Sequence, residues 1–100
     1  MVAFACGVLL SDPLAAARGA VHTIVIEGSS YTPAALSVRK GDTIVWVNKD
    51  PFPHTVTAPG AFDSHSIAAN RSWRYAARVP GEYGYTCTLH PNMKGNLKIE

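Results

Sequence analysis

The segment from Cys87 to Met93 carries three potential metal ligands, Cys87, His90 and Met93, at intervals of three residues. In an extended strand this spacing would send the side chains to opposite faces, because the side-chain period of a strand is two residues. In a turn-like loop, residues three apart lie on the same side, about 5–6 Å apart at Cβ. Pro91 lies within the segment and reduces the entropy lost when the loop is ordered. We therefore expect the sulfur, the imidazole and the thioether to converge on one ion.

The ligand types favour copper over zinc. Zinc sites use cysteine, histidine and carboxylate ligands and hardly use methionine, whereas copper accepts a weak, long axial methionine above a trigonal plane of two histidines and a cysteine. The second histidine is predicted to be His54, because the Pro-Phe-Pro segment 51–53 holds its approach rigid. His22 and His65 are expected to be solvated surface histidines.

Short strands separated by turn residues must position these ligands. The β-branched or alternating runs are 21–26, 36–39, 43–48, 54–57, 72–76, 82–87 and 95–100. Turn signals recur every eight to twelve residues and no helical period is sustained, although 66–70 could form a single turn. The pattern predicts an all-β, Greek-key β-sandwich of seven to eight strands. The residues Trp46, Trp73, Tyr75 and Tyr83 are expected to pack in the core or across strands.

Composition excludes several classes of protein. One hundred residues, 47% of them hydrophobic and 16% charged, describe one small domain and no disordered tail. Nine basic and seven acidic residues give a net charge of +2, which is too small for a protein that must neutralise many phosphates, so no nucleic-acid partner is expected. No apolar run is long enough to cross a bilayer.

The first twenty residues have the layout of an export signal. An uninterrupted apolar run, 1–10, is followed by the small-residue run 14–20. No Lys or Arg precedes the apolar run, so an uncleaved anchor stays open, and a lipoprotein acylated at Cys6 is a weaker alternative. We predict a signal peptide or N-terminal anchor over 1–20, a copper-binding domain over 21–100, and a periplasmic or otherwise exported protein, tethered to the membrane if the segment is not cleaved.

Export would leave Cys87 as the single cysteine of the mature chain. An unpaired thiol is a liability in an oxidising compartment, so this cysteine needs a role. Its options are an intermolecular disulfide, redox chemistry or a metal. A bound metal would also help a core of about 80 residues, because its binding free energy adds to folding.

Three motifs together resemble a cupredoxin of the plastocyanin and amicyanin group. They are Lys40-Gly-Asp-Thr-Ile-Val-Trp-Val-Asn48, Pro53-His54, and Gly81-Glu-Tyr-Gly-Tyr-Thr-Cys87-Thr-Leu-His90-Pro-Asn-Met93-Lys-Gly95. The compact ligand loop is most similar to that of amicyanin. The resemblance implies one type 1 copper ion, with His54, Cys87 and His90 as equatorial ligands and Met93 as the axial ligand.

Two positions depart from the family pattern. Thr55 stands where asparagine often follows the first histidine, and Leu89 stands where amicyanin has proline. We expect both changes to tune the site through the residues around the ligands. The residues expected to support the ligands or to form an apolar docking surface near His90 are Thr55, Thr88, Leu89, Pro91, Phe52 and Pro53.

The resulting prediction is a monomeric electron carrier that cycles between Cu(I) and Cu(II) and is not an enzyme, with no small-molecule substrate. Redox proteins such as a c-type cytochrome or a periplasmic dehydrogenase are its expected partners. Five basic residues either steer an acidic partner or form a merely solvated face; they are Lys49, Arg71, Arg74, Arg78 and Lys94.

Two other functions stay open. A non-redox protein that stores or delivers copper could use the same ligands. An immunoglobulin-like binding module would explain Trp46 and the Tyr85-x-Cys87 pattern, but its second cysteine is absent from residues 21–100.

Overall fold

The computed structural model describes residues 19–100, so the predicted signal peptide or anchor lies outside the described residues, apart from its last two positions. Within this range the chain is all-β, and no helix is present that could cross a membrane. The strands are β1 (Val21–Glu27), β2 (Ser30–Thr32), β3 (Ala35–Val38), β4 (Thr43–Asn48), β5 (Thr57–Ala58), β6 (Phe62–Asp63), β7 (Ser72–Ala76), β8 (Gly81–Cys87) and β9 (His90–Ile99).

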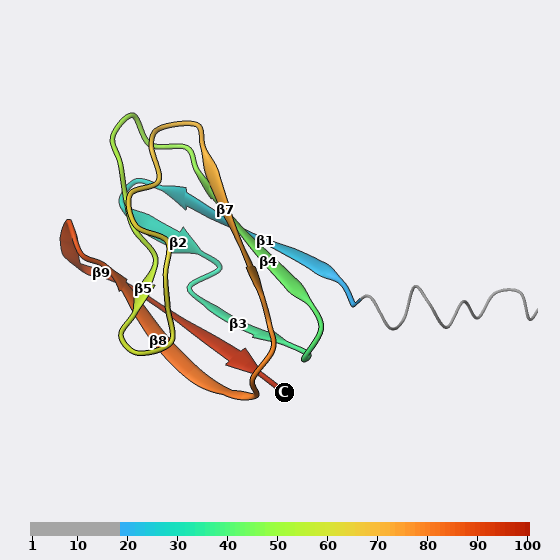
Figure 1. Ribbon diagram of the computed structural model, residues 1–100. Helices are drawn as coiled ribbons and strands as arrows, with labels where there is room; N and C mark the ends of the chain where they lie inside the picture. Colours follow the sequence, from blue (N-terminus) through green and yellow to red (C-terminus); the bar gives the residue numbers. More distant parts are fainter. Residues whose placement is uncertain (1–18) are drawn as a thin grey trace, which may run out of the picture.

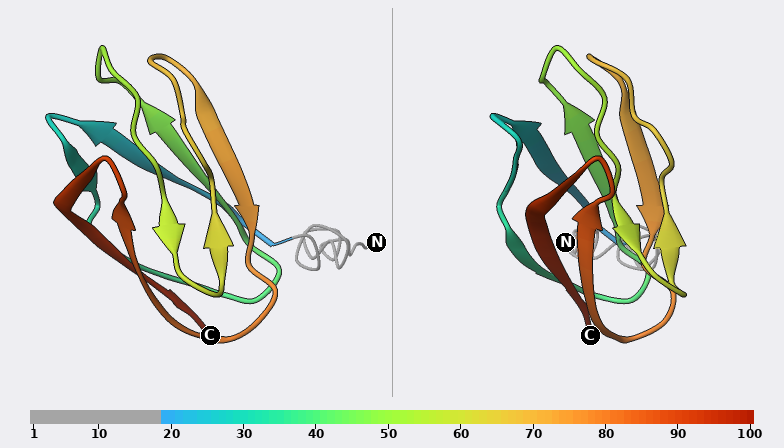
Figure 2. Two further views of the ribbon diagram at one scale, coloured as in Figure 1. Left: turned by 60° about the vertical axis from the view of Figure 1, so that its left-hand side comes forward. Right: turned by 90° about the vertical axis from the view of Figure 1, so that its left-hand side faces the viewer.

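Two sheets pack face to face. One has the strand order β2-β1-β4-β7 and the other the order β3-β9-β8-β5-β6 (Figure 1). The pairs β1–β4 and β3–β9 are parallel and the other pairs are antiparallel. The two layers are seen in Figure 2. The predicted β-sandwich is confirmed, with nine strands because the short strands β2 and β6 are additional to the predicted ones.

The strand boundaries differ from the prediction in several places, and β9 begins at His90 rather than at residue 95. Residues 30–32 form β2, which is too short to show a period in the sequence. Residues 62–63 pair with β5 although the sequence pattern indicates a loop. The predicted strand 54–57 is reduced to an isolated bridge between His54 and Ile67 and the start of β5.

The core is built from the inward faces of both sheets. β1 alternates exposed and buried positions from Thr23 to Glu27, as a strand covered on one face must. Trp46 and Tyr85 are its largest fully buried side chains, and their rings meet edge to face with centroids 5.5 Å apart. Trp46 is therefore buried in the core, and Trp73, Tyr75 and Tyr83 are partly buried against it, as expected.

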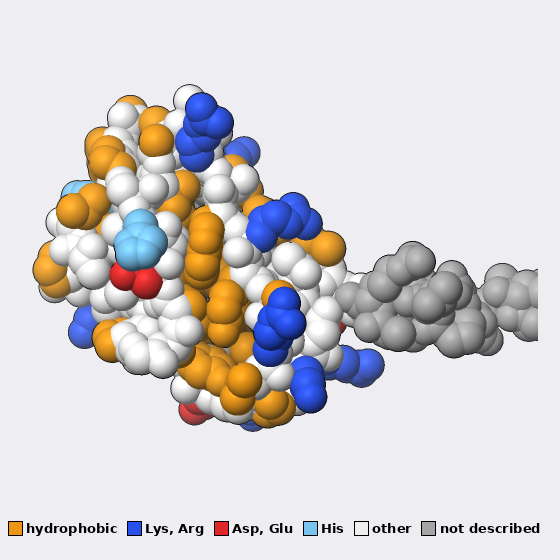
Figure 3. All heavy atoms as spheres, in the orientation of Figure 1, with side chains coloured by type: hydrophobic (Ala, Val, Ile, Leu, Met, Phe, Trp, Pro, Cys, Tyr) orange, Lys and Arg blue, Asp and Glu red, His pale blue; other side chains and the backbone are white. Residues whose placement is uncertain are grey.

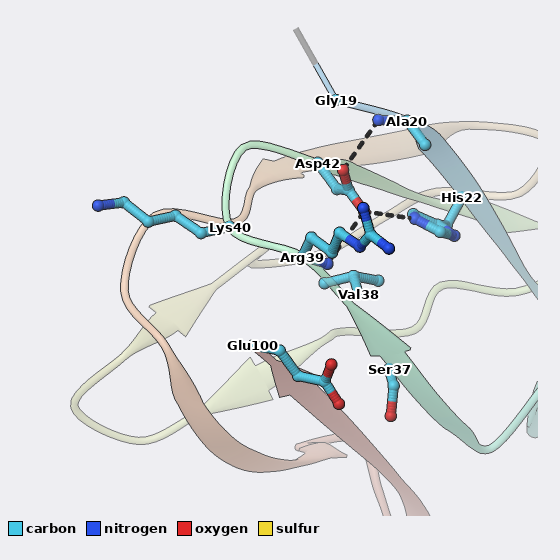
Figure 4. Close-up of a pocket in the computed structure, with 9 residues that line it drawn as sticks. All are labelled: Gly19, Ala20, His22, Ser37, Val38, Arg39, Lys40, Asp42 and Glu100. Atoms are coloured by element: carbon cyan, nitrogen blue, oxygen red, sulfur yellow. Dashed lines mark hydrogen bonds and ion pairs between the residues drawn. The ribbon is translucent and has the colours of Figure 1, made fainter. Parts of the chain in front are cut away.

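Asp42 fastens the start of the domain to the end of the sandwich opposite the β8–β9 turn. Its carboxylate accepts hydrogen bonds from the backbone N–H of Ala20 (2.9 Å) and of Arg39 (3.0 Å). His22 Nε2 lies 2.8 Å from the same carboxylate, as Figure 4 shows. The prediction that His22 is simply solvated is wrong, because its side chain is 28% exposed and paired with Asp42.

We expect Asp42→Asn to weaken the fold at neutral pH and to flatten its acid dependence. The hydrogen bonds from Ala20, Arg39 and His22 lower the pKa of Asp42 from 3.8 to about 2. A lowered pKa means that the stabilisation is present above pH 3.8 and is lost as the pH falls through 2. Urea unfolding at pH 7 and at pH 2 measures this stabilisation. The variant should lose on the order of 2 kcal/mol at pH 7 and much less at pH 2. An equal loss at both pH values would contradict this expectation.

Candidate metal centre

Three predicted ligands meet at one end of the sandwich. Cys87 Sγ lies 3.6 Å from His54 Nδ1 and 3.8 Å from His90 Nδ1. All three donor atoms lie within 4.8 Å of one another, and among residues 19–100 no other group of three His, Cys, Asp or Glu side chains is so arranged. His54 and Cys87 are fully buried, and His90 is half-buried.

The spacing Cys-x-x-His comes from a tight hairpin. Cys87 ends β8, His90 begins β9, and the two residues are Cα partners across the turn Thr88–Leu89. A register shift between Thr86 and Cys87 accompanies this pairing. The loop expected from the sequence is therefore partly strand, but it turns both side chains to the same side, as the ligand prediction requires.

The donor set fits one metal ion as it stands. A metal with nitrogen ligands at about 2.0–2.1 Å and a thiolate at about 2.3 Å holds each nitrogen about 3.6–3.8 Å from the sulfur when the angles lie between tetrahedral and trigonal. The two nitrogen–sulfur separations fall in this range. No side chain would have to move far for the three donors to reach one ion.

Met93 lies in β9 beside this cluster. Its side chain is 4% exposed, and it lines with His90 a pocket of about 390 Å³. In copper sites an axial methionine binds the ion weakly and at long distance. Its assignment as the axial ligand stays a prediction.

Asp50 is a residue that the sequence analysis missed. Its buried carboxylate lies 2.7 Å from His54 Nε2. Two backbone N–H groups of the β1–β2 turn, those of Gly28 (2.7 Å) and Ser29 (2.9 Å), also donate to it. Because Nε2 faces a carboxylate, it carries the proton, and Nδ1 is left free as a ligand.

The environment of Asp50 keeps it ionised. Burial alone would raise the pKa of this carboxyl, but the N–H groups of Ser29 and Gly28, together with His54, outweigh burial and hold the pKa below its usual value. Asn48 fixes the backbone that carries this carboxylate: its Oδ1 accepts from the backbone N–H of Asp50 at 2.9 Å. The signal for this arrangement is present in the sequence as an aspartate four residues before the ligand histidine, next to the end of a strand.

Thr55 connects the two ligand-bearing segments. Its backbone N–H points to Cys87 Sγ at 3.3 Å, and its hydroxyl oxygen accepts from the N–H of Thr88 at 2.9 Å. Tyr31 donates to the carbonyl oxygen of Thr55 at 2.6 Å. Burial, and then the neighbouring Cys87, raises the pKa of Tyr31, so this hydroxyl stays a donor. The shorter threonine thus bridges to the ligand loop where asparagine often stands in similar sequences.

An apolar rim surrounds the half-buried edge of His90. Phe52 is 42% and Leu89 52% exposed, and Pro53 and Pro91 are exposed beside them. The ring of Phe52 lies 5.7 Å from that of His90, centroid to centroid. In contrast, the side chain of His65 is 85% exposed and lies outside the cluster, as predicted.

Comparison with known proteins agrees with this geometry. A family model described as a cupredoxin-like domain matches residues 1–99. Amicyanin from Paracoccus denitrificans is 30% identical over 97 residues, which cover 89% of this chain and 74% of that protein. Plastocyanin from Synechococcus sp. (strain JA-2-3B'a(2-13)) is 31% identical over 103 residues, which cover 81% of this chain and 71% of that protein.

Solved structures give the same result. An amicyanin variant in its Cu(I) form superposes with a TM-score of 0.76 at 26% identity, covering 80% of this chain and 82% of that one. A Cu-containing nitrite reductase from Thermus scotoductus SA-01 superposes with a TM-score of 0.74 at 27% identity over 79% of this chain. The matched part is only 22% of the enzyme's length.

Proposed function

The chain belongs to the cupredoxin-like family, and from this premise we propose that it is a small type 1 copper protein that carries single electrons between redox partners. The proposed ligands of its one copper ion are His54, Cys87, His90 and Met93. The convergence of two imidazole nitrogens and one sulfur on a site with the right spacing carries the proposal.

Copper, when bound, supplies a one-electron couple between Cu(I) and Cu(II). The protein's own contribution is to hold its donors still and dry. His54 is fixed by Asp50, and Cys87 receives the N–H of Thr55. Because His54 and Cys87 are fully buried, water is kept away from both donors.

Electrons would enter and leave at the exposed edge of His90. The apolar rim of Phe52, Pro53, Leu89 and Pro91 gives a partner a small contact surface there. Electron-transfer encounters are typically small and short-lived. A c-type cytochrome or a periplasmic dehydrogenase would suit such a surface, and a monomer is expected.

We propose no enzymatic activity for this chain. The buried donors leave no approach for a substrate on the side of His54 and Cys87. The likeness to nitrite reductase supports only the shared fold of one part of that enzyme, since about a fifth of its length is matched.

The proposed location is the periplasm, with 1–20 as a signal peptide and 21–100 as the copper-binding domain. The apolar run and the small residues after it support export. Intact mass spectrometry of the protein from a periplasmic fraction tests this, and a full-length mass in the membrane fraction would favour the anchor instead.

Addition of Cu(II) to the purified protein tests the function. We expect an intense blue colour that disappears on reduction and returns on oxidation. A copper-storage or delivery protein would instead exchange its ion readily with a chelator, without fast electron self-exchange. The burial of two donors favours the carrier, and a colourless product would contradict it.

We expect Met93→Leu to keep the blue colour and to raise the reduction potential. The thioether stabilises Cu(II) more than Cu(I), so its loss should raise the potential by tens of millivolts. Leucine preserves the volume of this buried side chain. Voltammetry measures the change, and an unaltered potential would show that Met93 does not contact the ion.

A further inference from the structure

The exposed charge of the domain is more positive than its net charge. Residues 19–100 contain eight Lys and Arg, all exposed, and six Asp and Glu. Two of the acids, Asp42 and Asp50, are buried and hydrogen-bonded. The surface of this part of the chain therefore carries eight positive and four negative side chains, a difference of +4.

Three of the exposed cations line one edge of the sandwich. Arg71, Arg74 and Arg78 lie within or next to β7, and none has an ion-pair partner among residues 19–100. In Figure 3 a row of Lys and Arg side chains follows the course of β7, with an apolar band beside it. Unpaired cations in a row give this edge a positive field that is open to a partner.

Aromatic side chains on β7 contribute to the band. Trp73 and Tyr75 are half-exposed and stack with their centroids 5.8 Å apart. The ring of Tyr75 also packs against the ring of Phe62 in β6, with the centroids 4.4 Å apart. Burial, and next Tyr83, raises the pKa of Tyr75, whereas Arg78 lowers it, which agrees with a guanidinium close to this phenol.

The surface has the composition and position of a docking site. Tryptophan, tyrosine and arginine are the residues most enriched at interface hot spots. β7 pairs only with β4, so it is the edge strand of its sheet and is not covered by another strand of that sheet. Because side chains alternate along a strand, Trp73 and Tyr75 project from one side of β7 and Arg74 from the other. The residues around this open edge are Arg71, Trp73, Arg74, Tyr75 and Arg78, and we call this set the β7 face.

Packed aromatic rings join the β7 face to the metal centre. The ring of Trp73 lies 5.6 Å from that of Trp46, and Trp46 lies 5.5 Å from Tyr85. Tyr85 precedes Cys87 by two residues in β8, and both are buried on the same face of that strand. The edge of the sandwich is thus in van der Waals continuity with the strand that carries the thiolate.

We propose that the β7 face is a second docking surface, which binds an acidic redox protein and passes one electron between that partner and the metal centre. Only the electron-transfer part of this proposal rests on the proposed function; the binding part does not. One electron leaves the partner and reduces the oxidised centre, and no bond or proton is transferred. Positive side chains select the acidic partner, and the aromatic rings supply the desolvated contact.

Flavodoxin, an acidic one-electron protein, is a suitable probe. Oxidised flavodoxin takes no electron from the copper(I) form or from the metal-free form of the chain. When it is added to each form, the changes in the amide and indole NMR shifts of the chain map where it binds. The copper-free titration does not depend on the proposed function. Flavodoxin hydroquinone then gives one electron to the oxidised copper form, forming its semiquinone, and stopped-flow absorbance measures the rate.

The two variants compared are Arg74→Glu and Lys98→Glu, which change the net charge equally. Lys98 lies on the other sheet, in β9, and is exposed. We expect flavodoxin to shift Trp73 and residues 71–78. At low ionic strength, we expect Arg74→Glu to weaken binding and to slow reduction by about five- to tenfold, and Lys98→Glu to change either by less than about twofold.

Three outcomes overturn the proposal. NMR shift changes confined to the apolar rim around His90 would mean that flavodoxin binds that rim and not the β7 face. Equal effects of the two variants would mean that only net charge matters. Unchanged binding in Arg74→Glu would mean that the arginines only protect an edge strand from self-association.

Discussion

Cys87→Ala should leave a folded chain that no longer turns blue with copper. The thiolate is the one sulfur ligand expected to bond strongly, and the visible absorption of such sites depends on it. We expect the charge-transfer band to disappear, and copper affinity to fall more than about a hundredfold, since even residues behind the ligands are worth 10–100-fold. Absorption and electron paramagnetic resonance spectra, with a competing chelator, measure both effects.

The control for Cys87→Ala is His65→Ala, which removes an exposed imidazole outside the cluster. It should keep the colour and the affinity of the parent protein. Cys87 is fully buried and accepts the N–H of Thr55, so the alanine variant should also lose about 1–2 kcal/mol of stability in the metal-free state. A blue Cys87→Ala protein would refute the proposed ligand set.

Asp50→Asn should raise the reduction potential by on the order of 100 mV. The carboxylate adds negative charge next to His54 Nε2, which makes the imidazole a better donor and stabilises Cu(II) over Cu(I). Asparagine keeps the size and the acceptor oxygen but removes the charge. Voltammetry gives the potential, and the copper hyperfine coupling in the electron paramagnetic resonance spectrum reports the altered donor strength of His54.

A purely structural role for Asp50 predicts another result. In that case Asp50→Asn would lower stability, because the N–H groups of Gly28 and Ser29 would lose a charged acceptor, but it would leave the potential of the folded copper form unchanged. The matched control is Asp63→Asn, which removes an exposed carboxylate and should move the potential by less than about 20 mV because solvent screens it.

The proposed ligands could be selected from the sequence because most of the information for them is local. Cys87 and His90 are joined by a two-residue hairpin, so their separation in sequence fixes their approach in space. Strand periodicity likewise predicts which side of β1 is buried. His54 comes from a distant segment, but the proline-flanked approach and the lack of a better histidine are enough to select it.

The supports of the ligands could not be predicted in the same way. Asp50 meets Gly28 and Ser29 across more than twenty residues, and Thr55 meets Cys87 across 32. Such partners are decided when the β1–β2 turn and the two sheets pack together. His22 illustrates the same point, since nothing next to it in sequence indicates its pairing with Asp42.

Residue types and short spacings therefore determined the all-β class, the kind of metal and its proposed ligands, because donor chemistry and strand period are properties of neighbouring residues. Tertiary structure alone decided which carboxylate holds His54, how Thr55 joins Thr88, and that β7, with its arginines and aromatic side chains, lies at the open edge of its sheet. The physical reason is that hydrogen bonds and burial depend on distance in space, and only the packing of both sheets brings these remote segments together.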